Sequence, residues 1–240
     1  MNHCEIEELR TQNSWFTGRT TEEEDRVIIR DYVNVLEVKE RVIPSDYYPL
    51  TGKYEVFNYT NTHMIGVSEE DRHILSIFDK VHYQLGEAYK NSDNLTKALR
   101  EAGYNAQTYT GWLFENNHVI HHAWTVLWVH ERPSVLDLSD MMMVVGKLIL
   151  PDAKMSDTEL RRKFATVAAD LMKRPNHERC APVGIPSLPY YYVGSPSTGA
   201  EGVALFNKVA HKYPNHPCMA RYNRFNGKNP THELVRKKMR

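Results

Sequence analysis

The sequence lacks three features that would each place a protein in a definite class. Its 240 residues include three cysteines, Cys4, Cys180 and Cys218, which are too few and too scattered for a disulfide framework. No apolar run reaches the roughly 18 residues of a membrane span, and the N-terminus has neither the basic start nor the apolar stretch of a signal peptide. We therefore expect a cytoplasmic protein that is not integral to a membrane.

The sequence also lacks a net charge, because thirty basic residues balance thirty acidic ones. As a whole, the molecule is not expected to be an electrostatic binder of nucleic acid or of anionic membranes. The charge is unevenly distributed, however: residues 1–25 hold seven acids against two bases, and residues 219–240 hold seven bases against one acid. A basic end of this kind can follow phosphates, and a solvated terminal charge run is the alternative.

Helical patterns occur before and after the middle of the chain. Ser68 has the form of an N-cap, and apolar residues recur at helical spacing from there to Leu85. A second helix is predicted over residues 92–102, where Gly103 supplies a stop. Ser156 and Glu159 form a capping box, so a third helix is expected to begin there.

The middle third is rich in β-branched and aromatic residues. It predicts three successive, mainly antiparallel strands over residues 106–114, 118–129 and 135–150. The less regular residues 1–62 are interpreted as an N-terminal extension or cap with short strands. Residues 63–240 are interpreted as one α/β domain with a basic C-terminal tail.

Near the end of the chain, a strand over 190–193 is expected to turn through Gly-Ser-Pro-Ser-Thr-Gly into a helix over 199–212. The turn has no lysine of a phosphate loop, and Ser195 is followed by Pro196, so the stretch is not a nucleophile elbow. We interpret it as a turn of small residues that lets the helix begin close to the sheet. A last strand is expected around 217–225, and the order predicts a βαβ step with a parallel crossover.

Three stretches in this order carry a family resemblance. GWLFENNHVIHHAWTVLW resembles the first central hairpin of the GCN5-related N-acetyltransferase (GNAT) superfamily, and MMMVVGKLILPD resembles its central strand. YYYVGSPSTGAEGVALFNKVAHKY is similar to the family's next strand and helix. The resemblance covers residues 68–225. It implies a mixed, mainly antiparallel central sheet flanked by helices, and transfer of an acyl group from acetyl-CoA or another acyl-CoA to an amine acceptor.

The resemblance implies two sets of site residues. The first would hold the coenzyme, through strand amides on the pantetheine arm and a lysine near the pyrophosphate: Val144, Val145, Lys147 and Lys154. The second would move protons, with a base on the central strands and an acid near the last helix: Glu115 or His122, and Tyr213 or Tyr222.

Two departures from the family's pattern keep a second function open. The segment PDAKMSDTE after the central strand contains no glycine, whereas the family holds the pyrophosphate on glycine-rich backbone. Phe206 stands where the family has a proton-donating tyrosine. The alternative is a GNAT-shaped protein without acyl-CoA activity that binds nucleic acid, through its basic C-terminus, or a protein partner. A homodimer is also left open.

A run of histidines suggests a third hypothesis, a metal-dependent enzyme. On a strand, His118 and His122 share one side and His121 faces the other. At most two of the three could therefore share an ion, while a structural or catalytic site needs three or four protein ligands. No metal site is predicted.

Overall fold

The computed structural model describes residues 4–10, 17–23, 26–34, 37–44, 48–57, 62, 65, 68–115, 118–139, 156–180, 190–214, 216 and 230–239. Before residue 48 it describes the backbone alone. The strands are β1 (Cys4–Arg10), β2 (Thr17–Glu23), β3 (Arg26–Asn34), β4 (Glu37–Pro44), β5 (Glu55–Phe57), β6 (Ala106–Glu115), β7 (His118–Val129), β8 (Arg132–Leu136) and β9 (Tyr190–Pro196). The helices are α1 (Glu69–Lys80), α2 (Ala88–Glu101), α4 (Asp157–Leu171), α5 (Asn176–Arg179), α6 (Gly199–Lys212) and α8 (Pro230–Lys238).

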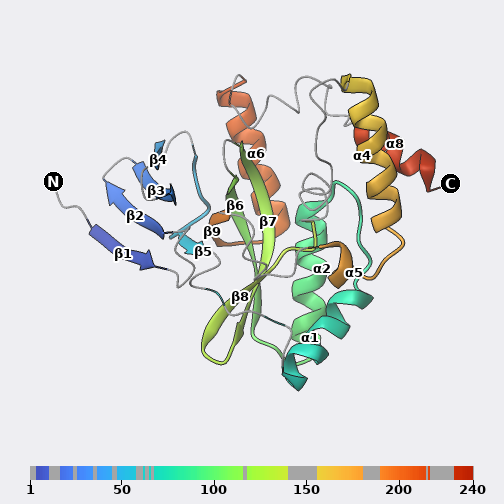
Figure 1. Ribbon diagram of the computed structural model, residues 1–240. Coiled ribbons are helices and arrows are strands. Elements are labelled where there is room, and N and C mark those ends of the chain that lie inside the picture. Colours follow the sequence, from blue (N-terminus) through green and yellow to red (C-terminus); the bar gives the residue numbers. More distant parts are fainter. Residues whose placement is uncertain are drawn as a thin grey trace.

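These strands form two sheets (Figure 1). A four-stranded sheet runs β1-β2-β3-β4, and a five-stranded sheet has the order β5-β9-β6-β7-β8. The N-terminal 62 residues therefore make a sheet of their own and add β5 to the edge of the main one. The α/β class and the strands predicted over 106–114 and 118–129 are confirmed.

The predicted βαβ step involves strand residues up to Leu150 and around 217–225, which lie outside the described residues. β9 pairs antiparallel with both β5 and β6, and the β6–β7 and β7–β8 pairs are antiparallel too. The chain returns from α4 to the far side of the β6–β7 hairpin, so β9 runs opposite to β8. The third strand begins at Arg132 and its described part ends at Leu136, and the rest of the predicted strand lies outside the described residues, as does that over 217–225.

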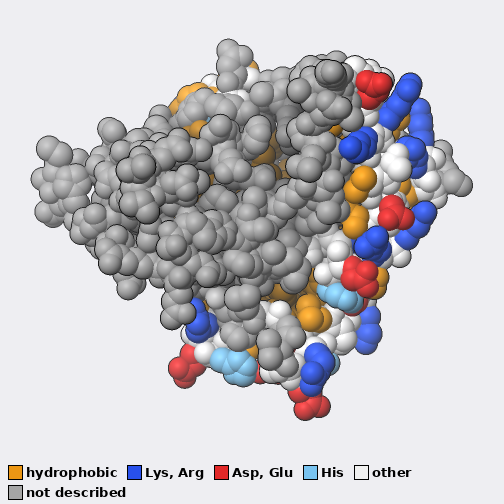
Figure 2. Space-filling view, in the orientation of Figure 1, with side chains coloured by type: hydrophobic (Ala, Val, Ile, Leu, Met, Phe, Trp, Pro, Cys, Tyr) orange, Lys and Arg blue, Asp and Glu red, His pale blue; other side chains and the backbone are white. Residues whose placement is uncertain are grey.

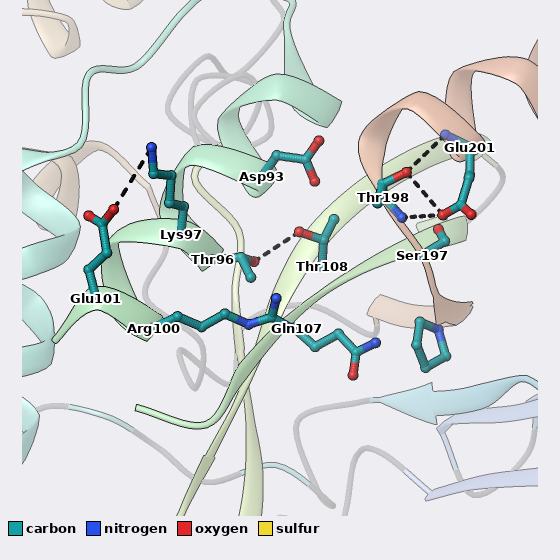
Figure 3. A pocket seen from close by; sticks show the side chains of 11 residues that line it. Asp93, Thr96, Lys97, Arg100, Glu101, Gln107, Thr108, Ser197, Thr198 and Glu201 are labelled. Carbon is teal, nitrogen blue, oxygen red and sulfur yellow. Dashed lines mark hydrogen bonds and ion pairs between the residues drawn. The ribbon is translucent and has the colours of Figure 1, made fainter. Parts of the chain in front are cut away.

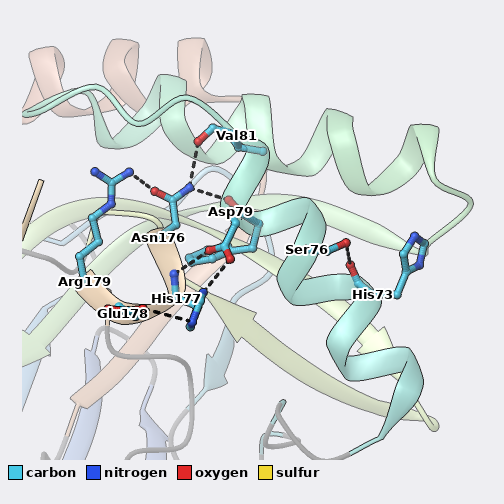
Figure 4. Close-up of polar contacts among 9 residues, drawn as sticks. His73, Ser76, Asp79, Val81, Asn176, His177, Glu178 and Arg179 are labelled. Carbon is cyan, nitrogen blue, oxygen red and sulfur yellow. Dashed lines mark hydrogen bonds and ion pairs between the residues drawn. The ribbon is translucent and has the colours of Figure 1, made fainter. Parts of the chain in front are cut away.

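The predicted helices are confirmed, with two differences in their bounds: α2 begins at Ala88 and not at Ser92, and α1 ends earlier than predicted. Ser68 and Asp71 form a reciprocal capping box, but α1 ends at Lys80 and not at Leu85, because Val81 is extended. The side-chain amide of Asn176 donates to two carbonyls at this end, those of Phe78 and Val81 (Figure 4). These bonds satisfy carbonyl groups that a helix end leaves without a partner.

Short helix α5 is held to the same end of α1 by a second set of bonds. The carboxylate of Asp79 accepts from the backbone N–H of His177 at 2.9 Å and lies 2.6 Å from its Nδ1. The guanidinium of Arg179 lies over the ring of Tyr83, 4.5 Å from its centroid. The loop before α2 and the loop after α4 are thereby fixed together (Figure 4).

Helices α2 and α6 pack on one face of the main sheet, against β6 and β7 (Figure 1). A Cβ on Gly202 would come within 2.6 Å of Thr110 Cγ2, and one on Gly199 within 2.8 Å of the Tyr89 carbonyl oxygen. Helix α6 therefore approaches the sheet and α2 more closely than a larger residue allows. This supports the interpretation of the small-residue turn.

The largest apolar cluster lies beyond α2, where α1, α4 and α8 meet the sheet. Leu95 and Leu99 of α2 are fully buried there, beside Ala165 and Ala168 of α4 and Val235 of α8. Within the described part of the chain, no helix is both long and apolar enough to cross a membrane.

Candidate active site

Strand β7 sends alternate side chains to opposite faces of the sheet. Thr125 lies on the helix-covered face, since its hydroxyl donates to the Ser92 carbonyl of α2 at 3.1 Å. Trp124 and Val126 lie on the other face, in a buried cluster with Tyr109 and Tyr192. His121 therefore belongs to the helix-covered face and His122 to the aromatic one.

A buried ion-pair geometry joins His122 to Asp137, the residue that follows β8. Its Nε2 lies 2.7 Å from Oδ2 of Asp137, and the side chains are 8% and 2% exposed. The hydroxyl of Tyr192 donates to the same Oδ2 at 3.1 Å, and the backbone N–H of Ser139 donates to Oδ1 at 2.9 Å. The carboxylate of Asp137 thus has three hydrogen-bond partners, as a buried polar group requires.

This arrangement sets the tautomer of His122. A carboxylate at Nε2 requires the proton on Nε2, so a neutral ring carries its lone pair on Nδ1. Nδ1 makes no hydrogen bond with the described residues. A histidine held in this way can accept a proton at Nδ1, while Asp137 stabilises the resulting positive charge.

His121 has the opposite surroundings. The ring centroids of Trp112 and Phe206 lie 4.7 and 5.7 Å from that of His121. Its Nδ1 is 2.6 Å from the hydroxyl of Tyr89, and its buried Nε2 has no partner among the described residues. Burial, with smaller contributions from the nearby His122 and His216, lowers the pKa of His121 to about 3. His121 is therefore neutral near pH 7.

Of the predicted proton-transfer residues, His122 is the one with the hydrogen-bonded carboxyl partner described above. Glu115 and Tyr213 lie elsewhere. Glu115 pairs with His118 and Tyr190 at the end of β6, four residues beyond Gly111, the partner of His122. Tyr213 lies at the C-terminal end of α6, with its ring against the cluster of Trp112 and Phe114.

Because strand residues alternate, Trp112 and Phe114 lie on the face opposite His122. The structure thus does not bring Tyr213 to His122. The remaining candidates fall outside the described residues: Tyr222, Val144, Val145, Lys147 and Lys154.

Sequence reasoning did not identify Asp137 and Tyr192. A signal for Asp137 existed, because His122 and Asp137 are the ionisable residues of two otherwise apolar stretches, HAWTVLWV and SVLDL. Buried polar groups need partners, so two such residues in adjacent antiparallel strands are candidates for a pair. Tyr192 carried no such signal, because its partner depends on β9 lying beside β6.

A polar groove lies between α2 and the start of α6, with a volume of about 620 Å³. Lys97 and Arg100 line it from α2, and Thr198 and Glu201 line it from α6 (Figure 3). The N-terminus of α6 is already closed by carboxylates, since Glu201 accepts from Thr198 N and Asp93 from Gly199 N. This end of α6 therefore disfavours a further anion.

The N-terminus of α4 is closed in the same way. Ser156 N donates to the Glu159 carboxylate at 3.0 Å, and Glu159 N donates back to Ser156 Oγ. A phosphate bound there would have to displace Glu159. Among the described residues, no three histidine, cysteine, aspartate or glutamate side chains are grouped as a metal site would require.

The fold and the site define an α/β protein whose antiparallel main sheet carries a buried histidine–aspartate pair. Comparison of the chain with protein-family models, with curated proteins and with solved structures gave no match.

Proposed function

We propose that the protein transfers an acyl group from a coenzyme A-type thioester to an amine acceptor, with His122 as the general base. The observation that carries this proposal is the buried His122–Asp137 pair, which leaves Nδ1 of His122 to accept a proton. Proton transfer to a positioned histidine is a common part of acyl-transfer chemistry. The coenzyme and the GNAT relationship rest on the resemblance of residues 68–225.

In the proposed reaction, Nδ1 of His122 takes a proton from the amine nitrogen as that nitrogen attacks the thioester carbonyl carbon. The carbon–nitrogen bond forms, the carbon–sulfur bond breaks, and the sulfur leaves as a thiolate. Asp137 stabilises the imidazolium that forms, and Tyr192 and Ser139 hold the Asp137 side chain in place by hydrogen bonds. The imidazolium then releases its proton to solvent.

The leaving thiolate needs a proton from a separate acid. Phe206 has none to give, and Tyr213 lies on the face away from His122. Tyr222 is therefore the acid in this proposal. The pantetheine arm would be held by backbone amides near Val144, Val145 and Lys147, and Lys154 would attract the pyrophosphate.

A second candidate is a protein of this shape without acyl-CoA activity, which binds a macromolecular partner. The carboxylates of Glu159, Glu201 and Asp93 favour it, because they close the N-termini of α4 and α6 to a diphosphate. The two candidates differ in whether coenzyme A binds.

Calorimetric titration with acetyl-CoA and desulfo-CoA separates the two candidates. We expect micromolar binding of both ligands, weakened in Lys154→Glu. The His122→Gln variant should bind both normally, yet release no free thiol when mixed with acetyl-CoA and a panel of amines. If neither ligand binds, acyl transfer from coenzyme A is wrong and the second candidate takes its place.

A further inference from the structure

Basic residues follow the solvent side of α4 and the turn that comes after it. Arg162, Lys163, Lys173 and Arg174 are exposed, while Ala165, Ala168 and Leu171 on the other side are buried. From Arg162 to Arg174 the chain advances about 18 Å at the helical rise of about 1.5 Å per residue. The four basic side chains are thus spread along α4 and the turn after it, and are not gathered at one position.

Helix α8 adds three more bases beside these four. It packs against α4 through Leu234 and Val235, which join the main apolar cluster. Arg236, Lys237 and Lys238 form its last turn and are exposed. Segments about 70 residues apart in the chain are therefore combined in one surface, which we call the α4–α8 face.

Most of the basic side chains on the α4–α8 face form no ion pair with the part of the chain that the structure describes. Arg162, Lys163, Lys173, Lys237 and Lys238 form no ion pair with the described residues. The exposed acids of α4 are already engaged, since Asp170 pairs with Arg174 and Glu159 caps the helix.

Figure 2 shows Lys and Arg side chains gathered along the right-hand edge of the molecule, the side on which Figure 1 places α4 and α8. Asp and Glu side chains also lie along this edge, between the basic ones.

We propose that the α4–α8 face binds nucleic acid through its phosphates. Duplex DNA carries one charge per about 1.7 Å of axis, so a line of bases about 18 Å long can meet several phosphates at once. Arginine adds bidentate contacts to phosphate oxygens. A membrane surface fits less well, because Met239 is the one exposed large hydrophobic residue described on α8 and α4 and interfacial helices bury an apolar face. This inference does not depend on acyl transfer.

The test is fluorescence anisotropy of the full chain with a labelled duplex of about 30 base pairs, at salt concentrations from about 50 to 200 mM. With about five phosphate contacts, the logarithm of the binding constant should fall against that of salt with a slope of about −4.5, several hundredfold over this range. R162E/K163E and K237E/K238E should each weaken binding at least about tenfold and make the slope shallower by about two.

The matched control is K53E/K90E, which changes the net charge by the same four units at exposed positions outside α4 and α8. It should bind the duplex within about threefold of the original chain, and a thermal melt checks that all variants fold. Three results would overturn the proposal: no binding of the duplex at low salt, equal weakening in the control, or binding to anionic lipid vesicles in place of nucleic acid.

Discussion

Two histidines that are adjacent in the chain have opposite surroundings. His122 has a carboxylate at 2.7 Å, which is itself supported by a tyrosine hydroxyl and a backbone N–H. His121 has aromatic rings on two sides and an unpaired, buried Nε2 among the described residues. A strand sends neighbours to opposite faces, so the face decides which of the two can carry charge.

The comparison extends to the whole sheet. On the helix-covered face, threonine hydroxyls form a chain of hydrogen bonds. Thr108 donates to Thr96, which lies 3.1 Å from Thr125, and Thr125 donates to the Ser92 carbonyl. The opposite face has the buried carboxyl group of Asp137, which accepts from Tyr192, and the Tyr192 ring packs against Trp124. The proposed proton transfer by His122 would therefore take place on the face away from α2 and α6.

The largest difference in stability between substitutions on the two faces should come from removing the Asp137 carboxyl group. Asp137→Ala leaves His122 and the Tyr192 hydroxyl without their partner, and breaking a buried pair costs about 3–5 kcal/mol. We expect this loss in the free energy of unfolding measured with urea at pH 7. His121→Phe, which replaces an already neutral ring by an apolar one, should cost no more than about 1 kcal/mol. Equal costs would contradict the comparison.

The pH dependence of stability should show a second effect, because burial holds His121 neutral. Its pKa is about 3 in the folded chain against about 6.5 in the unfolded chain. The unfolded state therefore binds more protons between these values, and stability present above pH 6.5 is lost as the pH falls towards 3. The loss is up to about 1.4 kcal/mol per pH unit.

Unfolding in urea at several pH values measures this slope in the original chain and in His121→Phe. The variant should lose less stability between pH 6.5 and pH 4, because it lacks the group that titrates on unfolding. Parallel curves for the two proteins would show that His121 is not held neutral by the fold.

Close packing on each face is tested by glycine substitutions. A Cβ on Gly194 would lie 2.4 Å from the Trp124 ring, and one on Gly202 would lie 2.6 Å from Thr110 Cγ2. Overpacking typically costs about 1–3 kcal/mol, so both alanine variants should lose stability by this amount. Gly194→Ala should also alter the near-ultraviolet circular dichroism of Trp124.

Gly52 supplies the control for these variants. A Cβ there has its nearest neighbour, Ser195 Cβ, at 4.0 Å, an ordinary contact distance. Gly52→Ala should therefore change stability by less than about 0.5 kcal/mol. A loss as large as that of Gly194→Ala would mean that backbone freedom, and not packing, explains the effect.

Local patterns predicted the secondary structure well. The capping boxes at Ser68 and Ser156 placed the starts of α1 and α4 correctly, because a cap is made by residues three positions apart. The end of α1 was missed, since it depends on Asn176, almost a hundred residues away. The position of β9 was missed for the same reason: strand order is set by contacts that no local pattern contains.

Half of the candidate site could be predicted from the sequence. His122 was identified because a histidine on a central strand can act as a base near pH 7 and the family resemblance places a base there, and its face followed from alternation. Asp137 and Tyr192 come close to His122 because β9, β6, β7 and β8 are neighbours in the sheet. Their positions can therefore be inferred only when the strand order is known. The coenzyme-binding residues and the GNAT relationship stay predictions, as does a cytoplasmic location.

The smallest expected effect concerns the hydroxyls of the helix-covered face. Thr125→Val keeps the shape of the side chain but removes the donor to the Ser92 carbonyl and the contact with Thr96. A neutral hydrogen bond contributes about 1 kcal/mol net, and a buried acceptor left without its donor adds to the loss. We expect about 1–2 kcal/mol, measured by urea unfolding.

Thr166 provides the matched control, because its hydroxyl also donates to a helix carbonyl, that of Arg162, but in an exposed position. Water replaces that bond in Thr166→Val, so the change should stay below about 0.5 kcal/mol. A clear difference between the two variants would show that the helix-covered face depends on neutral hydrogen bonds, as the aromatic face depends on one ionised pair. If neither variant lost stability, apolar packing alone would hold α2 on the sheet. The two faces would then differ only in the buried carboxyl group of Asp137.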